Sequence, residues 1–301
     1  MRILIKKSTF FEYVIALAII LDCNSVWNNL IETRTWFQFA VMVMLLVGVM
    51  GFLFFSRCTP RNTFGVSFLI ILYYLLFVVL NGNSIIQTVL NIMLSCVLIG
   101  VYNMAKNQNG NVADLLVCFK NIMLLIAVIS LIFWFAGSVF EIVQPTGTSL
   151  TNWTGNTNQP VMKSYFGVYY SYQRISFFNK LNIVRNIAIF NEAPMSSLCF
   201  SLGLMVELLC CEKWKKRNCV VFVVAILSTF STTGYIIATV VCVYKYIKSN
   251  SQYSVIRLIK GLCVPVMICV VLIIANSLIQ EKLSTFSGMA RTDDFVSGFQ
   301  A

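Results

Sequence analysis

Apolar stretches about as long as a bilayer is thick recur along this chain and constrain its fold more than any other feature. They lie at 9–26, 36–55, 63–80, 84–101, 121–140, 195–211 and 262–279. A membrane-spanning helix needs about 20 predominantly apolar residues. The chain is 58% hydrophobic and 11% charged, whereas a soluble domain carries about 25% charged residues. These patterns exclude a soluble globular fold and predict an all-α, polytopic membrane protein.

The stretch 219–247 is long for one membrane span and short for two, and it contains a turn-forming Ser-Thr-Phe-Ser-Thr-Thr-Gly sequence at 228–234. Reading it as a helical hairpin places more of the 22 lysines and arginines on the side of the N-terminus than a single span does. Because cytoplasmic loops are enriched in these residues, we favour the hairpin. The prediction is a single integral membrane domain over 1–301, with about nine transmembrane segments and a cytoplasmic N-terminus.

This topology places two polar regions outside the membrane, a long loop at 141–194 and a tail at 280–301. The tail does not return to the membrane, so we expect the chain to be a C-terminally shortened form of a longer protein. Its Arg291 lies in a Ser-Gly-Met-Ala-Arg-Thr-Asp-Asp cluster at 287–294, which reads either as a helix start at Thr292 or as a weak metal-binding pattern.

Several chemistries are unavailable to this sequence. It contains no histidine, which removes conventional zinc sites and histidine-based triads. Its 11 cysteines include no Cys-x-x-Cys pair and lie mostly in apolar stretches, as small membrane residues do. No phosphate-loop or dinucleotide-binding glycine pattern occurs. We therefore predict no metal and no cofactor. The net charge of +11 is explained by membrane loops rather than by nucleic acid.

The long loop holds the candidate functional residues. Its first part, 141–160, is rich in Thr, Asn, Gly and Pro and is expected to be an irregular surface segment. Its second part, 163–185, is aromatic and basic. One interpretation is an interfacial segment in contact with lipid headgroups. The other is a groove in which Tyr169 and Tyr172 hold sugar rings and Arg174 binds phosphate through its planar fork.

The loop closes with Arg-Asn-Ile-Ala-Ile-Phe-Asn-Glu-Ala-Pro at 185–194, directly before an apolar helix. Pro194 suits the first turn of that helix, and Glu192 would meet the positive end of its dipole. Helix capping can therefore account for Glu192 and Pro194, but it does not account for Arg185. We expect the Arg185 guanidinium to face the water layer outside the membrane, where an anionic lipid headgroup can approach it.

Three segments together resemble the Wzy-type polymerases of bacterial O-antigens, capsules and exopolysaccharides, within the O-antigen polymerase/ligase group. They are the 185–194 box, the Leu-Ser-Thr-Phe-Ser-Thr-Thr-Gly turn at 227–234 that follows a basic Lys-Trp-Lys-Lys-Arg loop at 213–217, and the 287–294 cluster. The resemblance covers about the last third to two-fifths of the chain. The sequence departs from the family pattern at Ala193, where many relatives have proline, and in ending at Ala301.

The resemblance implies an enzyme of the bacterial cytoplasmic membrane that transfers a growing glycan from undecaprenyl pyrophosphate onto a lipid-linked repeat unit at the outer face. Its partners would be that lipid-linked oligosaccharide, membrane lipids, a flippase and a chain-length regulator. Arg185 would neutralise the leaving pyrophosphate, and Glu192 would act as the base for the attacking hydroxyl. Arg291 and Arg174 would contact phosphate or glycan. The alternatives are a related O-antigen ligase and a lipid-linked oligosaccharide flippase or transporter.

Overall fold

The computed structural model describes residues 7–56, 63–81, 86–107, 113–151, 161–177, 181–211 and 213–248. It is mostly helical, with 72% helix in eight α-helices, as the apolar stretches predicted. The predicted segment at 262–279 and the tail at 280–301 lie outside the described residues.

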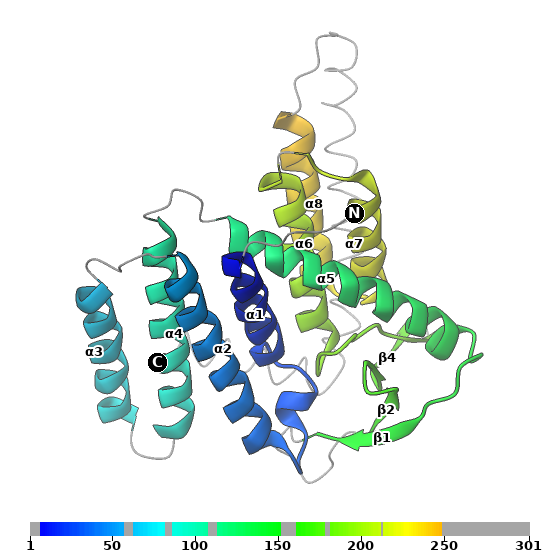
Figure 1. The fold of residues 1–301 in the computed structure, drawn as a ribbon. Helices are drawn as coiled ribbons and strands as arrows, with labels where there is room; N and C mark the ends of the chain where they lie inside the picture. The colour runs from blue at the N-terminus through cyan, green and yellow to red at the C-terminus, as the bar shows by residue number, and fades with distance from the viewer. Residues whose placement is uncertain are drawn as a thin grey trace, which may run out of the picture.

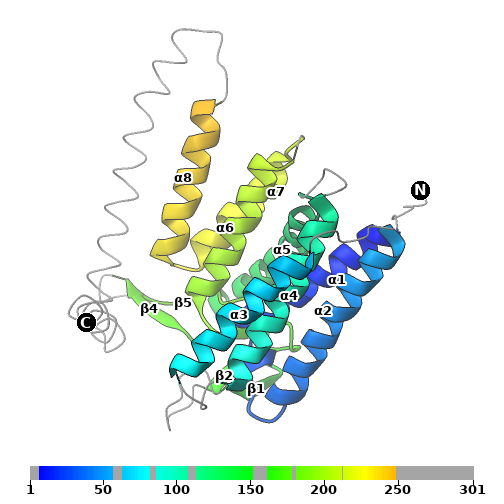
Figure 2. The ribbon, with the colours of Figure 1, turned by 90° about the vertical axis from the view of Figure 1, so that its left-hand side faces the viewer.

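The first half of the chain forms one group of helices. These are α1 (Lys7–Asp22), α2 (Arg34–Ser56), α3 (Thr63–Asn81) and α4 (Ile86–Asn107), with a short 3-10 turn, η1 (Trp27–Asn29), between the first two. Helix α2 packs against both α1 and α4, and α3 packs on the outer side of α4 (Figures 1 and 2). Gly51 of α2 permits the close approach of α1, because a Cβ atom there would overlap the ring of Phe11.

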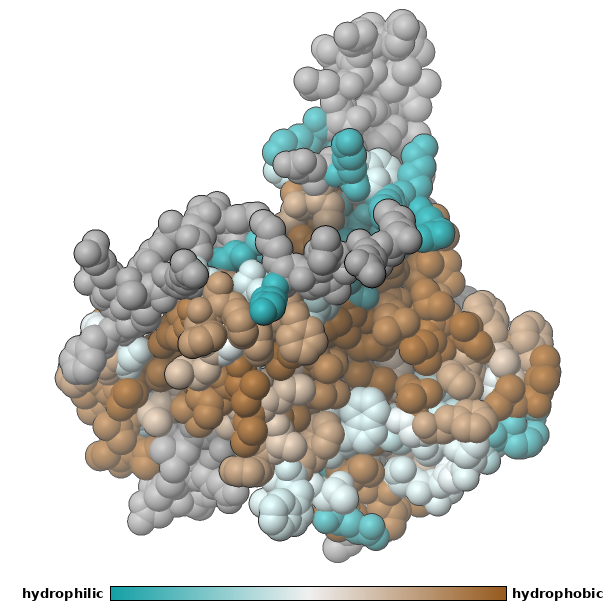
Figure 3. Space-filling view, in the orientation of Figure 1, coloured by the Kyte–Doolittle hydropathy of each residue, from teal (hydrophilic) through white to brown (hydrophobic). Residues whose placement is uncertain are grey.

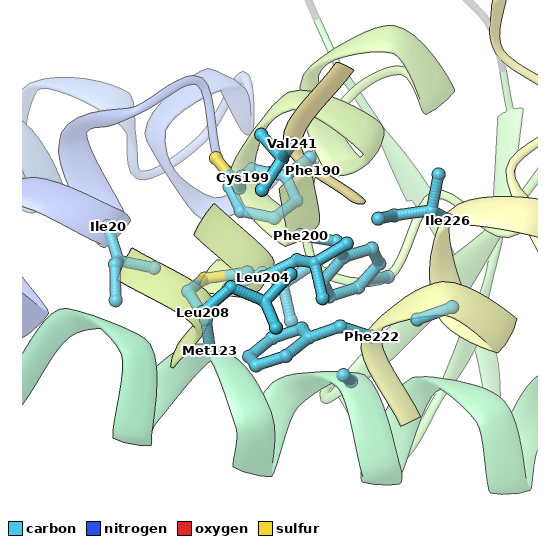
Figure 4. Close-up of a cluster of buried hydrophobic side chains, with 14 residues drawn as sticks. Ile20, Met123, Phe190, Cys199, Phe200, Leu204, Leu208, Phe222, Ile226 and Val241 are labelled. Atoms are coloured by element: carbon cyan, nitrogen blue, oxygen red, sulfur yellow. The ribbon is translucent and has the colours of Figure 1, made fainter. Parts of the chain in front are cut away.

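The second half forms a second group around a tilted central helix. Its elements are α5 (Asp114–Phe133) with a π-helical continuation, η3 (Trp134–Val139), α6 (Ala193–Leu209), α7 (Lys216–Ser228) and α8 (Thr232–Lys248). Helix α5 contacts α1, α6 and α7 and so joins the two groups. Phe200 and Leu204 of α6, Phe222 of α7 and Met123 of α5 are fully buried together in the core (Figure 4). The stretch 219–247 therefore contains two helices with a turn between them, as the hairpin interpretation requires.

Five short strands in the long loop are the main feature that the sequence did not predict. They are β1 (Gly147–Leu150), β2 (Val161–Tyr165), β3 (Tyr169–Ser171), β4 (Arg174–Phe177) and β5 (Leu181–Val184). The first three form an antiparallel sheet, and the last two form a hairpin. Segment 141–160 is thus not wholly irregular, because β1 pairs with β2 in the register Gly147 to Ser164. Burial alternates at the start of β2, where Val161 and Lys163 are exposed and Met162 and Ser164 are buried, as a strand with one covered face requires.

The two ends of the helix bundle differ in how charge is held. At one end, Lys106 Nζ lies 2.6 Å from Glu12 Oε1 and 2.7 Å from Asp114 Oδ2, and Lys120 Nζ lies 2.9 Å from Glu207 Oε2. We call this the ion-pair end. The strands gather at the opposite end, which we call the loop end (Figures 1 and 2). Helix α6 begins at the loop end and finishes at the ion-pair end.

Two helical runs among the described residues, Arg34–Ser56 and Asp114–Val139, are long and apolar enough to cross a membrane. Only 28% of the apolar window in each is buried inside the protein, so most of it faces outward, unlike the core helix of a soluble protein. Exposed large side chains include Trp36, Phe54 and Val79, each more than three-quarters exposed. Hydrophobic residues form a broad band across the face in Figure 3, with hydrophilic residues above and below it. This distribution indicates membrane association.

Candidate functional site

The box at 185–194 connects β5 to α6 and is buried rather than exposed to water. Arg185 is only 8% exposed, which differs from the expectation that its guanidinium faces the water layer. Its Nε donates a hydrogen bond to the carbonyl of Thr229 at 2.9 Å, and Nη2 donates to the carbonyl of Phe230 at 3.1 Å. Both carbonyls follow directly after α7. Because carbonyl groups at a helix C-terminus attract cations, the guanidinium holds the turn between α7 and α8.

Two asparagines that the sequence analysis missed fix the rest of the box. The Asn186 amide donates to the hydroxyls of Ser228 at 2.9 Å and Ser130 at 3.3 Å. The Asn191 amide donates to the backbone carbonyl of Asn24 at 3.0 Å. Both asparagines are fully buried. The two asparagines flank an apolar Ile-Ala-Ile-Phe run at 187–190. A buried amide requires hydrogen-bond partners, so an asparagine at each end of such a run was the signal in the sequence.

Glu192 stands at the N-terminus of α6 without capping it. Its side chain makes no capping hydrogen bond, although its position beside the helix dipole agrees with the prediction. The Oε1 atom of Gln173 instead accepts a hydrogen bond from the backbone N–H of Ala193 at 3.0 Å. Pro194 lies in the first turn, as predicted. A proline at 193 would lack the backbone N–H that donates to Gln173, so alanine at this position permits the hydrogen bond.

A small cavity of about 140 Å³ opens beside the box, between η3 and the two sheets. Arg174 and Tyr172, both predicted site residues, line it together with Lys163 and Glu141. Neither Lys163 nor Glu141 was predicted as a site residue from the sequence. Lys163 could have been found from the alternation of β2, which places it on the exposed face between buried neighbours. Two cations and one carboxylate at a single cavity suit an anionic ligand that also carries hydroxyl groups.

Tyr172 joins this cavity to the box. Its hydroxyl donates to the carbonyl of Asn191 at 2.8 Å and accepts from Nε2 of Gln173 at 2.9 Å. Burial raises the pKa of the Tyr172 hydroxyl, and the nearby Glu192 carboxylate also raises it, while Gln173 and the Arg185 guanidinium lower it. The hydroxyl is therefore protonated at neutral pH. Arg174 and Tyr172 line the cavity, and Arg185 and Glu192 lie close to Tyr172.

The other two predicted site residues are not part of this arrangement. Tyr169 is fully buried, its hydroxyl is 3.1 Å from the Ser138 hydroxyl, and its ring stacks on Phe133 at 6.2 Å between centroids. Burial raises the pKa of the Tyr169 hydroxyl. Tyr169 therefore supports η3 from the core rather than lining the cavity. Arg291 lies outside the described residues.

Within the part of the chain that the structure describes, no group of three or more Cys, Asp or Glu side chains is placed to hold a metal ion. No family model, curated protein or solved structure matches this chain. The residues of the cavity and of the box must therefore carry any proposal about function.

Proposed function

We propose that the chain is a membrane-embedded polysaccharide polymerase, with the 140 Å³ cavity as its glycan-transfer site. In this proposal the protein crosses the bacterial cytoplasmic membrane about nine times, the N-terminus is cytoplasmic, and the loop end faces outward. The observation that supports it best is the position of Lys163 and Arg174 at one cavity, beside the box that carries the resemblance. Lysines and arginines concentrated at the ion-pair side of α7 and α8, such as Lys216 and Lys245, agree with this orientation.

The proposed reaction is a displacement at the anomeric carbon of the donor glycan. The bond between that carbon and the pyrophosphate oxygen breaks, and a bond to a hydroxyl oxygen of the acceptor sugar forms. Undecaprenyl pyrophosphate leaves with the electron pair, and the hydroxyl proton passes to a carboxylate. Lys163 and Arg174 bind the pyrophosphate and stabilise its developing charge. The Tyr172 hydroxyl donates its one proton to the Asn191 carbonyl, so its oxygen is available to a glycan as an acceptor of a hydrogen bond from a sugar hydroxyl.

Two carboxylates are available as the proton acceptor, and geometry separates them. Glu141 lines the cavity itself, on a residue whose backbone adopts a left-handed conformation with φ of 54°. Glu192 lies beside Tyr172 at the dipole of α6, as the resemblance predicts for the base. A general base must reach the hydroxyl whose proton it removes. Comparing Glu141→Gln with Glu192→Gln for glycan chain length identifies which of the two acts.

The role proposed for Arg185 changes in the light of its contacts. Its guanidinium binds main-chain carbonyls of the α7–α8 turn, so it acts as a positioning residue and adds positive charge near Tyr172. Pyrophosphate binding passes to Arg174 and Lys163. Arg185→Lys keeps the charge but loses the two-point contact, so it should shorten glycan chains mainly by loosening the turn.

The test compares surface glycan in cells that lack the gene and in cells that carry variants. Deletion should leave single repeat units at the surface, because transport across the membrane continues without polymerisation. Cells that carry only Arg174→Gln together with Lys163→Gln should also show single units, with chain growth reduced by about 10² or more. Lys216→Gln, at the ion-pair end, is the matched control and should leave chain length normal. Deletion that leaves no repeat unit outside the cell would favour the flippase and overturn the proposal.

A further inference from the structure

A second and larger cavity, of about 660 Å³, lies between α1, α2 and α4 at the loop end. It shares no lining residue with the 140 Å³ cavity. Part of its wall is apolar and includes Val41, Leu45 and Ile99, whereas its polar residues come from the end of α1, η1, the first half of α2 and Ser95 of α4. This volume falls within the range of about 300–1,000 Å³ that is typical of small-molecule sites. An amphipathic ligand fits such a wall.

Two opposite charges line this cavity, and each opposes its own helix dipole. Asp22 is the last residue of α1, where the dipole is negative, and Arg34 is the first residue of α2, where it is positive. Helices normally show the reverse arrangement. Neither side chain makes a hydrogen bond or an ion pair with a described residue. A ligand that carries both charges would compensate both helix ends.

A buried acceptor adds a third, independent feature. Asn28 lines the same cavity and is 9% exposed, and its Oδ1 atom has no hydrogen-bond partner within the described structure. Its Nδ2 atom donates to the backbone carbonyl of Asp22 at 3.3 Å, which fixes the orientation of the amide. An unpaired buried acceptor is costly. Oδ1 is therefore an acceptor that a ligand donor could satisfy where Asn28 lines the cavity.

We propose that this cavity binds a zwitterionic phospholipid with a phosphoethanolamine headgroup. The ammonium group donates to the carboxylate of Asp22 and to Oδ1 of Asn28, the phosphate meets Arg34 and the N-terminus of α2, and an acyl chain lies along the apolar wall. A lipid pyrophosphate fits less well, because its second phosphate adds negative charge near Asp22 without a second cation to balance it. The site is thus separate from the proposed transfer site and does not depend on the proposed function.

Bound lipid would also brace the box at 185–194. Cys23, which lines the cavity, contacts Met195 of α6 through their sulfur atoms at 3.7 Å. The neighbouring Ser25 carbonyl accepts a hydrogen bond from Asn191 at 2.9 Å. A ligand that orders the link between α1 and α2 therefore orders the start of α6 as well.

The test is native mass spectrometry of the purified, delipidated protein given equimolar dioleoyl phosphatidylethanolamine and dioleoyl phosphatidylglycerol. The unmodified protein should retain one phosphatidylethanolamine in preference to phosphatidylglycerol. Asp22→Asn should lower phosphatidylethanolamine retention about tenfold and reduce or reverse the preference, and Arg34→Gln should weaken both lipids. The matched controls are Glu32→Gln, an exposed acid in the same link, and Arg217→Gln at the ion-pair end. Both should behave as the unmodified protein.

Equal retention of the two lipids by the unmodified protein, or an unchanged preference in Asp22→Asn, would overturn the proposal. Should a variant fail to fold, the unmodified protein still decides the matter by thermal unfolding. Phosphatidylethanolamine should raise its Tm more than phosphatidylglycerol does. In the Arg174→Gln, Lys163→Gln double variant, which lacks the cations of the smaller cavity, farnesyl pyrophosphate should raise the Tm less than phosphatidylethanolamine does. A larger rise with farnesyl pyrophosphate in this double variant would assign the larger cavity to a pyrophosphate lipid instead.

Discussion

The two ends of the bundle use charge in opposite ways. At the ion-pair end, Glu12 and Glu207 are each 1% exposed and each is paired with a lysine. At the loop end, Asp22, Arg34 and Arg174 line cavities without any ion pair to a described residue. A buried charge must be paired or it destabilises the fold, whereas a charge at an open cavity can be kept for a ligand. Charge at the first end therefore serves the fold, and charge at the second end is available for binding.

Removing one partner at the ion-pair end should have the largest effect on stability. In Glu207→Leu, Lys120 loses its carboxylate, and the backbone N–H of Lys215 and the amide of Asn218 lose their acceptor. The expected cost is about 3–5 kcal/mol of unfolding free energy, measured by denaturant unfolding in detergent. Replacing Lys120 by Met in the same protein should recover most of the loss. A single variant as stable as the unmodified protein would show that this pair does not hold the fold.

Arg185 is the exception at the loop end, because its contacts are with the protein, and its replacement should have the next largest effect. Arg185→Lys retains the charge but cannot reach the carbonyls of Thr229 and Phe230 with the same fork. Loss of these charge-assisted hydrogen bonds should lower the unfolding free energy by about 1.5–3 kcal/mol. Protease sensitivity of the α7–α8 turn should increase together with it. If protease sensitivity of the turn and the unfolding free energy both stay unchanged, the contacts of Arg185 do not hold the fold, and its charge is available for a ligand.

Most helices of this protein could be predicted from hydropathy, and α7 and α8 from the turn sequence and the basic residues around them, whereas the loop could not. Apolar stretches of membrane length identify α2 and α5 because a helix is the only way to satisfy the backbone of so long an apolar segment. The strands are short and pair with their neighbours in sequence, so hydropathy gives no clear signal for them. The loop also contacts segments distant in sequence, as the isolated bridge between Leu30 and Thr151 shows. The same distance hides the site. Arg174 and Tyr172 were predicted from residue type, but Glu141 joins their cavity only through the path of η3, and Tyr169 lies in the core because Phe133 and Ser138 cover it.

Neutralising the charges of the larger cavity should give a small gain in stability when no lipid is bound. Asp22→Asn and Arg34→Gln each remove a charge that opposes a helix dipole. Each should raise the unfolding free energy of delipidated protein by about 0.3–1 kcal/mol at low ionic strength, with the gain reduced in high salt. Added phosphatidylethanolamine should remove the extra stability of the two variants, because the lipid stabilises the unmodified protein more than it stabilises them. This result would sharpen the contrast between the two ends of the bundle. A loss of stability in both delipidated variants would show that these charges already support the fold.

The smallest change in stability is expected at the proposed transfer site, where the effect on activity should be large. Arg174 is exposed and lines the smaller cavity, and its side chain makes no hydrogen bond or ion pair with the described residues. Surface substitutions of this kind change the unfolding free energy by about 0.5 kcal/mol or less. Arg174→Gln should therefore unfold at the same denaturant concentration as the unmodified protein while glycan chains shorten, and Arg174→Lys should restore only part of the chain length because a lysine binds phosphate at a single point. Shortened chains accompanied by a clear loss of stability would mean that Arg174, like Glu207, holds the fold, and the contrast between the two ends would fail.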